Sequence, residues 1–502
     1  MLTWMIFTPL IGAALILLMP KKAEAAIKWV ALGATVPPLI MAFQLFGSFD
    51  RTTPDMQLVQ RVAWIPAFNI EYYVGVDGIS ITMILLTALL STICIVASWN
   101  IDKAVKAYFP LFLLLDTAMM GVFCALDFFL FFVFWEVMLL PMYFLIGIWG
   151  GPRREYAAIK FFLYTMVGSV LMLVAMLALY FYNDPHTFDM LELARRAPTY
   201  SDNFQRFAWI ALFIGFAIKI PAFPFHTWLP DAHVEAPTAI SVILAGVLLK
   251  MGAYGILRIN YAILPVGTLE FAYYFLVVLG VVNIIYGALC AMAQTDYKKL
   301  IAYSSISHMG YVMFGMATFT QQGIDGAVLQ MFNHGTVTAM LFLLVGVIYD
   351  RAHHREINGF GGLASIMPFY TGWTAFAFFA AMGLPGLSAF ISEVLVLLGG
   401  WRYYPVLTVI SAAAVVLTAG YMLWTMQRIY LGPANEKYLD LPDINMREVG
   451  MLVPLAIIVI ILGVYPKPVL SLIDVSLTHL NETVLSAGQG PVASATGILS
   501  AR

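Results

Sequence analysis

The chain has 502 residues, of which 62% are hydrophobic and only 11% are charged, and its formal net charge is -2. Soluble domains are nearer to half apolar and a quarter charged, so this composition predicts a membrane protein with many spans rather than a soluble domain. The near-neutral charge gives no sign of nucleic-acid binding. The three cysteines lie singly in apolar runs, which indicates neither a disulfide framework nor a cysteine-based metal or redox motif.

The first apolar segment, MLTWMIFTPLIGAALILLMPKKAEAA, ends in a stretch that resembles a signal-peptidase site. A signal peptide carries positive charge before its apolar run, whereas both lysines here, Lys21 and Lys22, follow it. We therefore expect this segment to be retained as the first transmembrane helix.

Apolar windows of about 20 residues, the length that crosses a bilayer, predict about fourteen transmembrane helices. They start near residues 2, 26, 79, 108, 128, 157, 206, 238, 271, 299, 324, 367, 404 and 448. Polar connections occupy 48–75 and 183–205. The segment from Lys467 onward is too polar to span, although VLSLIDVSLTHL has the apolar spacing of a helix that lies on a surface.

The distribution of lysine and arginine predicts how these helices are oriented. With the N-terminus outside, most of the short loops that carry basic residues fall on the inner side, as the positive-inside rule requires. We expect a multi-pass protein of the bacterial inner membrane with both termini on the periplasmic side. Lys160 lies one turn into its helix and is expected to reach the headgroups.

Several ionisable residues lie inside the predicted spans, where each costs several kcal/mol and usually marks an ion or proton route. They are Glu136, Lys219, Lys250, His308, His334 and Glu393. Burial lowers the pKa of a lysine and raises that of a carboxyl, so such groups can change protonation near neutral pH. A single histidine such as His334 can also be a hydrogen-bonded packing residue. As a set on separate helices, the six residues favour a proton relay.

Two of the predicted spans are interrupted by proline beside these residues. Pro221 and Pro224 follow Lys219, and Pro385, in GLPGLSAF, precedes Glu393. Proline cannot continue the helical ladder, and broken backbone at membrane depth is tolerated where it is buried in protein or lines a cavity. Interrupted helices in corresponding positions indicate a transporter site, and these two lie five spans apart, so we expect two inverted five-helix repeats. The expected units are 1–100 with the first three helices, 101–260 with helices 4 to 8, 261–432 with helices 9 to 13, and 433–502 with helix 14 and the tail.

The stretch PFHTWLPDAHVEAPT, followed by AGVLLKMGAYGILR, resembles the antiporter-like membrane subunits of respiratory complex I, the NADH-quinone oxidoreductase. The resemblance extends over residues 75 to 430 or so. Within that family, a glutamate on the second broken helix is typical of the chain M branch, the equivalent of mitochondrial chain 4. The sister subunits and the Mrp-type antiporters usually place a lysine there, so Glu393 fits chain M.

The resemblance implies an all-α fold with fourteen spans and a central hydrophilic axis for protons, driven by quinone reduction elsewhere in the complex. It implies that Glu136 and Lys219 form an ion pair, that Lys250 leads to the centre, and that His308 and His334 continue to Glu393. Three residues at the inner end of the first broken helix are candidates for proton access, with loop capping as the alternative. They are His226, Asp231 and His233.

We identify no cofactor or metal site in the sequence of this chain. The resemblance implies that NADH, FMN, iron–sulfur clusters and quinone are bound by other subunits. The expected partners are those other membrane-arm subunits, including the sister antiporter-like subunits, together with membrane lipids.

Other functions remain open at this point. A subunit of an Mrp-type cation/proton antiporter or of a membrane-bound hydrogenase would use the same axis without NADH chemistry, and only Glu393 and the DAH form of the motif argue against it. A haem protein could use His308 and His334 as ligands, if they faced each other with room for a porphyrin. An intramembrane hydrolase would need HExxH or GxSxG motifs, which the sequence lacks.

Overall fold

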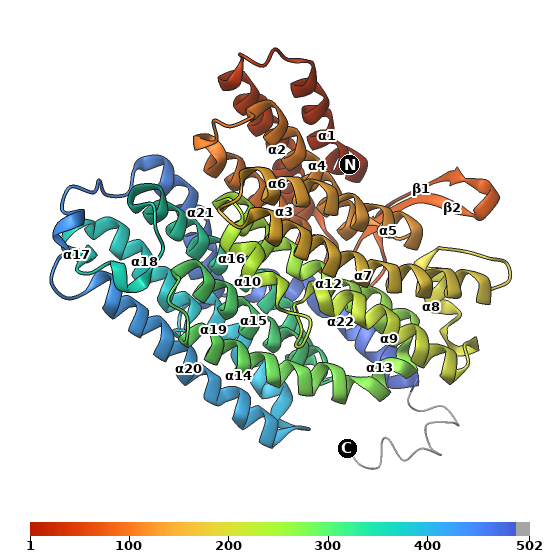
Figure 1. Cartoon of the computed structure of the whole chain (residues 1–502). Helices are drawn as coiled ribbons and strands as arrows, with labels where there is room; N and C mark the ends of the chain where they lie inside the picture. Colours follow the sequence, from red (N-terminus) through yellow and green to blue (C-terminus); the bar gives the residue numbers. More distant parts are fainter. Residues whose placement is uncertain (488–502) are drawn as a thin grey trace.

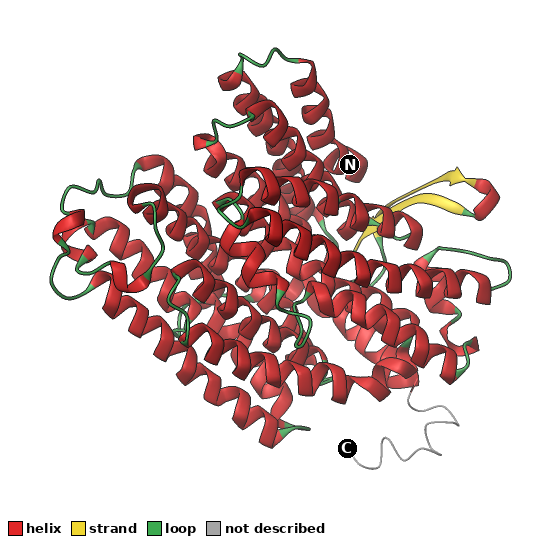
Figure 2. Cartoon of the chain, viewed as in Figure 1, coloured by secondary structure: helices red, strands yellow, loops and turns green. Residues whose placement is uncertain are grey.

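Helices make up most of residues 1–487, the part of the chain that this computed structural model describes (Figures 1 and 2). The helices of the N-terminal half are α1 Leu2–Leu18, α2 Glu24–Ser48, α3 Gly78–Ala97, α4 Val105–Cys124, α5 Phe128–Val137, α6 Leu139–Trp149, α7 Arg154–Tyr182, α8 Met190–Arg195, α9 Asp202–Lys219, α10 Trp228–Glu235 and α11 Thr238–Ile243. Those of the C-terminal half are α12 Leu249–Gly255, α13 Pro265–Phe271, α14 Leu279–Met292, α15 Tyr297–Met316, α16 Gln321–Ala352, α17 Leu363–Ile366, α18 Pro368–Ala381, α19 Ser388–Trp401, α20 Pro405–Tyr430, α21 Met446–Val464 and α22 Lys467–Ala487.

The prediction of an all-helical protein with many spans is confirmed. Within residues 1–487, ten helical segments are long and apolar enough to cross a membrane. The other predicted spans correspond to α1, α9, α15 and the α18–α19 pair, which are shorter, broken or more polar.

Three spans form the centre of the bundle. The segments Thr238–Tyr261 and Gln321–Ala352 are buried along their whole apolar windows, and α3 is nearly as enclosed. Helices such as α2 and α20 leave most of their apolar surface exposed, as spans that face lipid do. Lys250 and His334 lie on the two fully enclosed segments, so both are at the middle of the protein.

Aspartate and asparagine side chains fix where several of these helices begin. Asp77 accepts a hydrogen bond from the backbone of Ser80 at the start of α3, and Asp127 accepts one from Leu130 at the start of α5. Such caps satisfy backbone N–H groups that the helix itself leaves unpaired. Helix starts that coincide with a short polar residue could therefore be located well from the sequence.

The first polar connection forms a β-hairpin, which the sequence analysis did not predict. Strands β1 (Gln57–Ile65) and β2 (Ile70–Val76) pair antiparallel and extend away from the helices (Figure 1). Arg61 joins the hairpin to the second polar connection, with ion pairs to Glu71 at 2.5 Å and to Asp189 at 3.1 Å. The two long connections thus contact each other on one side of the bundle.

The helical segment expected after Lys467 is present as α22. Its buried residues include Leu472, Ile473 and Leu477, and the helix packs against α3, α13 and α16. The Ser476 hydroxyl accepts a hydrogen bond of 3.2 Å from the Gly78 backbone N–H at the start of α3. This helix therefore lies across the ends of other helices, on the same side as the β-hairpin.

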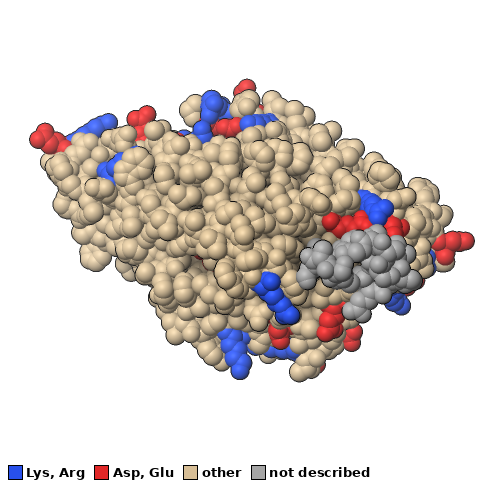
Figure 3. All heavy atoms as spheres, turned by 90° about the horizontal axis from the view of Figure 1, so that it is seen from below, with Lys and Arg blue, Asp and Glu red and all other residues tan. Residues whose placement is uncertain are grey.

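The opposite side carries most of the short loops that contain lysine and arginine, and we call it the basic face. Its loops are 19–23, 98–104, 150–153, 293–296, 353–362 and 431–445. In Figure 3, uncharged residues cover a broad part of the visible surface, and the charged side chains gather toward its edges. This distribution is that of a protein with an apolar belt in the membrane.

Candidate functional site

The helix that carries Lys219 breaks where the prolines predict. Helix α9 ends at Lys219, and α10 begins at Trp228. The Trp228 indole N–H donates to the Ile218 carbonyl at 2.8 Å. From α14, Asn283 donates to the Pro221 carbonyl at 3.1 Å and accepts from the Phe223 N–H at 2.7 Å. These side chains pair backbone groups that the break would otherwise leave unsatisfied.

Lys219 has a buried side chain without a hydrogen-bond partner among residues 1–487. Only 1% of the residue is exposed, and its ammonium nitrogen lies 5.1 Å from the ring centre of Trp135 and 5.5 Å from that of Phe161. Aromatic faces attract a cation, but they offer it far less than water or a carboxylate does. The charge on Lys219 is therefore poorly compensated.

Glu136 is the acid whose charge acts on Lys219. It follows Trp135 on α5, acts on Lys219 through space, and has a buried carboxylate oxygen that lacks a partner in the described chain. The two side chains do not form the direct ion pair that the resemblance implies. Glu136 also sits just before the irregular turn between α5 and α6, where Pro141 removes the N–H that would bond the Val137 carbonyl.

Lys250 lies beside a widened turn that the sequence pattern did not indicate. The π-helical turn η4 (Leu244–Leu248) joins α11 to α12 and is followed by Lys250, which is fully buried. Its ammonium group donates to the Ala245 carbonyl at 2.5 Å and contacts Nδ1 of His334 at 2.6 Å. Extra residues of this kind in a helix free carbonyl groups and often mark functional positions.

The second predicted break is also present, between the end of α18 at Ala381 and the start of α19 at Ser388. Gly383 and Gly386 take φ angles of +71° and +94°, which side chains rarely allow. Asn333 on α16 donates to the Ser388 carbonyl at 2.8 Å. Each broken helix is thus held by an asparagine from a neighbouring helix.

Glu393 is held by two neighbouring side chains. Its Oε1 contacts Nδ1 of His308 at 3.0 Å and accepts from the Gln330 amide at 3.3 Å. Gln330 in turn accepts from the Ser392 hydroxyl at 2.5 Å. The sequence analysis missed Gln330 and Asn333 on α16 and Asn283 on α14, which are uncharged amides inside predicted spans.

His308 and His334 face each other across a small space. Their ring centres lie 5.8 Å apart, and Nε2 of each has no partner among the described residues. The space, lined also by Ser304 and Thr338, measures about 10 Å³, which is the size of one water molecule. A porphyrin does not fit between these two rings, so the structure contradicts the hypothesis that they bind a haem between them. Within residues 1–487, no three or more His, Cys, Asp or Glu side chains converge on a possible metal site.

The three residues predicted for proton access lie in or just before α10, and each has its own surroundings. His233 is fully buried, stacks on Phe342 with 4.5 Å between ring centres, and has two ring nitrogens unpaired in the described structure. His226 is 2% exposed and lies against Tyr286, at 5.0 Å. Asp231 instead forms an ion pair with Lys160 at 2.7 Å, so Lys160 has a protein partner rather than reaching freely to the headgroups.

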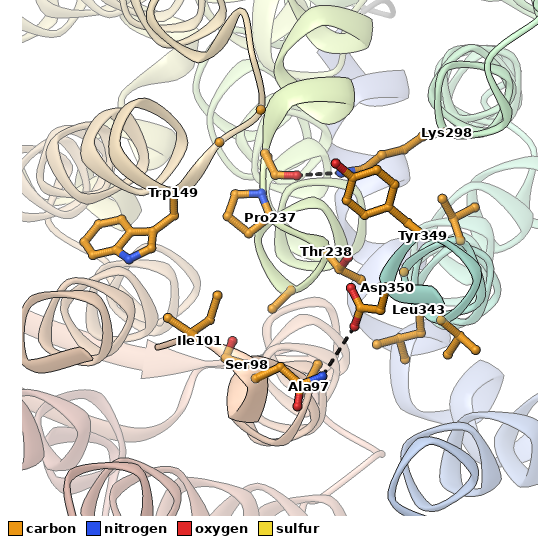
Figure 4. Close-up of a pocket in the computed structure, with 18 of the residues that line it drawn as sticks. Ala97, Ser98, Ile101, Trp149, Pro237, Thr238, Lys298, Leu343, Tyr349 and Asp350 are labelled. Carbon is orange, nitrogen blue, oxygen red and sulfur yellow. Dashed lines mark hydrogen bonds between the residues drawn. The ribbon is translucent and has the colours of Figure 1, made fainter. Parts of the chain in front are cut away.

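A cavity of about 250 Å³ opens near the basic face (Figure 4). Figure 4 shows Lys298 and Tyr349 on one side of it, and Trp149, Ile101 and Ser98 on the other. The Lys298 ammonium group donates to the Ala236 carbonyl at 2.5 Å, and only 4% of the residue is exposed. Lys298 is the second residue of α15 and lies within electrostatic range of His233.

Comparison with known proteins finds extensive similarity. The family model described as NADH:quinone oxidoreductase/Mrp antiporter, TM, matches residues 125–418. NADH-quinone oxidoreductase subunit M of Rhodobacter capsulatus is 44% identical, over 98% of this chain and 98% of its own length. NADH-ubiquinone oxidoreductase chain 4 of Chondrus crispus is 42% identical, over 95% of this chain and 96% of its own.

Solved structures share the fold. A chain of respiratory complex I from Thermus thermophilus with bound NADH gives a TM-score of 0.87 at 27% identity, covering 96% of this chain and all (100%) of that one. A chain of the Mrp complex from Dietzia sp. DQ12-45-1b gives 0.85 at 22% identity, covering 97% and 99%. At that identity, the second likeness shows a common fold alone.

Proposed function

Because the chain belongs to the family of NADH-quinone oxidoreductase subunit M, a membrane subunit of the proton-translocating respiratory complex I, we propose that its buried ionisable residues carry the proton. The route comprises Glu136, Lys219, Lys250, His334, His308 and Glu393. The chain is a multi-pass membrane protein that works as part of complex I with other subunits.

The observation that carries this proposal is the line of contacts from Lys250 to Glu393. Lys250 contacts His334 at 2.6 Å, His334 faces His308 across a water-sized space, and His308 contacts Glu393 at 3.0 Å. Each member can gain or lose a proton, and each is buried in the protein. A proton that leaves one member therefore has an adjacent acceptor, which is the requirement for a relay.

The surroundings of Lys219 support a role as the group that changes charge. Among residues 1–487, its ammonium group has aromatic rings but no hydrogen-bond partner nearby, and Glu136 has an unpaired buried oxygen. A buried ammonium group with weak compensation gives up its proton at a low cost in free energy. The loss of its positive charge then changes the electric field at the neighbouring Glu136 carboxyl group. The broken helix ends at Lys219, and broken backbone at this depth is tolerated because it is buried in protein and paired by Trp228 and Asn283.

Proton access from the basic face runs through His233 in this proposal. Lys298 borders the large cavity, and His233 lies within electrostatic range of both Lys298 and Lys250. His226, with Asp231 and Lys160 nearby, provides the corresponding access to Lys219. The ring nitrogens of both histidines are unpaired within residues 1–487 and can take up and release a proton in this proposal.

We also propose that residues 101–260 and 261–432 are the two inverted repeats. In the first, the acid Glu136 is on the second helix and the base Lys219 is on the broken fourth helix. In the second, the base His308 is on the second helix and the acid Glu393 is on the broken fourth. The acid–base pair occupies matching helices in both units, with the charges exchanged.

The remaining assignments follow from the family. We propose that NADH, FMN, the iron–sulfur clusters and quinone are bound by other subunits, and that the sister antiporter-like subunits flank this chain in the membrane arm. We place the basic face in the cytoplasm of a bacterium, which puts both termini on the periplasmic side of the inner membrane.

The test is proton uptake into membrane vesicles energised with NADH, comparing wild type with Lys219→Ala. We expect the variant complex to assemble and oxidise NADH but to lose proton uptake through this chain, because the relay loses the group that changes charge. Lys22→Ala, an exposed lysine on a basic-face loop, is the matched control and should pump as wild type does. Normal uptake in assembled Lys219→Ala would show that the break is architectural and that protons take another route.

A further inference from the structure

Asp116 is a buried acid that the proposed route does not use. It lies in α4, is 0% exposed, and accepts a hydrogen bond of 2.6 Å from the Ser91 hydroxyl on α3. Its second oxygen, Oδ2, has no partner among residues 1–487, and none of the ion pairs found there includes it. An ionised carboxylate in such a position is expensive, so a purely structural role would be filled at lower cost by a neutral residue.

Polar groups lead from the basic-face cavity toward Asp116. Ser98 and Tyr108 line the cavity, and their hydroxyls are 2.9 Å apart (Figure 4 shows Ser98). Cys94, one turn before Ser98, lies within electrostatic range of both Tyr108 and Asp116. Ser91, Cys94 and Ser98 are spaced by three and four residues, so they share one face of α3.

A neighbouring, apolar face of α3 packs against the centre of the proposed route. Leu90, next to Ser91, packs so closely against η4 that a Cβ at Gly246 would collide with it. One turn earlier, Leu86 packs equally closely on Gly335, the neighbour of His334. Helix α3, which bears the hydrogen-bond donor of Asp116, therefore also contacts η4, the turn just before Lys250, and the neighbour of His334.

We propose that Asp116 is a further proton-holding residue, on a branch along α3 and α4 that links the basic-face cavity to Lys250. The inference rests on the proposed proton-transfer function and adds a second access to it. In the first step, a hydronium ion at the cavity gives up a proton, an O–H bond forms at Oδ2 of Asp116, and water remains. In the second, that O–H bond breaks and Asp116 returns to a carboxylate, while water carries the proton toward η4 and the neutral amine of Lys250 takes it up as an ammonium ion.

The first test is the infrared difference spectrum between the assembled wild-type complex and Asp116→Asn. We expect the wild type to show the carbonyl-stretch band of a protonated carboxylic acid, and we expect this band to shift when the solvent is changed to D₂O. The band should be absent in Asp116→Asn and retained in Asp55→Asn. Asp55 is an exposed acid on the side of the bundle opposite the basic face. A carboxylate band alone, or an acid band that does not exchange with D₂O, would overturn the proposal.

The second test is the number of protons taken up per NADH oxidised in vesicles. Asp116→Asn should lower this ratio, Asp116→Glu should restore it, and Asp55→Asn should leave it unchanged. An unchanged ratio in assembled Asp116→Asn, together with loss of pumping in Lys219→Ala, would contradict the branch through Asp116 but would still support the proposed proton route. Normal pumping in Lys219→Ala would instead contradict the proposed function itself, whatever the infrared band of Asp116 shows.

Discussion

Glu393 and Lys219 lie beside corresponding helix breaks, yet their surroundings differ. The Glu393 carboxylate has two hydrogen-bonding neighbours, His308 and Gln330. The Lys219 ammonium group lies over two aromatic rings and has no hydrogen-bond partner in the described part of the chain. In the proposed route, the glutamate is therefore fixed in place by hydrogen bonds, whereas the lysine lacks such bonds within residues 1–487.

This difference gives a prediction for Glu393. In Glu393→Gln, the shape and most hydrogen bonding remain, but the side chain can no longer take a proton. We expect proton transfer through the second half to slow by roughly 10²-fold or more, since a positioned acid–base group contributes about that much. NADH-driven proton uptake in vesicles measures the effect, with the exposed Glu436→Gln as control. Full activity in Glu393→Ala would make the residue structural.

The residues that bear charge could be predicted from the sequence, but their supporting partners could not. Intramembrane charges are rare, so Lys250 and Glu393 stand out, and the family resemblance supplied their order. Gln330, Asn283 and Asn333 are ordinary amides until the fold brings them beside a break or an acid. The spacing of residues along one helix does not predict which neighbouring helix a given side chain will face.

At the scale of elements, helix breaks could be predicted from the sequence, whereas the widened helical turn could not. Proline blocks the backbone ladder by its covalent structure, so both breaks could be predicted. The π-helical turn η4, which aims Lys250 at the Ala245 carbonyl and at His334, needs no special residue. The β-hairpin was missed because it lies inside a connection that is conspicuous only for its polarity.

The crossing of α7 and α9 depends on two facing glycines and allows a direct test. A Cβ at Gly215 would lie 2.8 Å from the Gly168 carbonyl oxygen, which is backbone and cannot rotate away. Gly215→Val should therefore push the helices apart at a cost of about 1–3 kcal/mol or more. Because Lys219 lies one turn further along α9, proton uptake should fall as well.

The measurement for this variant is the temperature at which the assembled complex dissociates. Gly33→Val is the matched control, because Gly33 is also helical but has nothing within 4 Å of an added Cβ. The same residue change then alters helix propensity equally in both variants. Equal dissociation temperatures would mean that the α7–α9 contact is not as tight as the structure indicates.

At the scale of the whole molecule, buried ion pairs join segments that are distant in sequence. Asp77 at the start of α3 pairs with Arg258 at 2.6 Å, beside the hairpin. On the basic face, Arg351 at the end of α16 pairs with Glu448 on α21 at 2.8 Å. The central helices are thus fastened near both ends, while Lys219 and Glu136, two residues of the proposed route, form no ion pair within residues 1–487. This contrast leaves the middle of the bundle free to change its charges.

The Arg351–Glu448 pair provides a prediction about stability. The two side chains are only 9% and 6% exposed, so Arg351→Met leaves an unpaired buried carboxylate, at a cost of about 3–5 kcal/mol. Adding Glu448→Gln removes that charge and keeps the acceptor of the capping box with Asn445. The double variant should therefore recover most of the lost stability, measured as the dissociation temperature of the assembled complex.

The recovery should nevertheless be incomplete, because Arg351 also donates to the Pro442 and Asp443 carbonyls in the loop before α21. These hydrogen bonds are lost in both variants, and the second substitution cannot replace them. A double variant as unstable as Arg351→Met would show that the loop contacts, rather than the charge pair, fasten α16 to α21. A double variant as stable as wild type would show that the loop contacts contribute nothing.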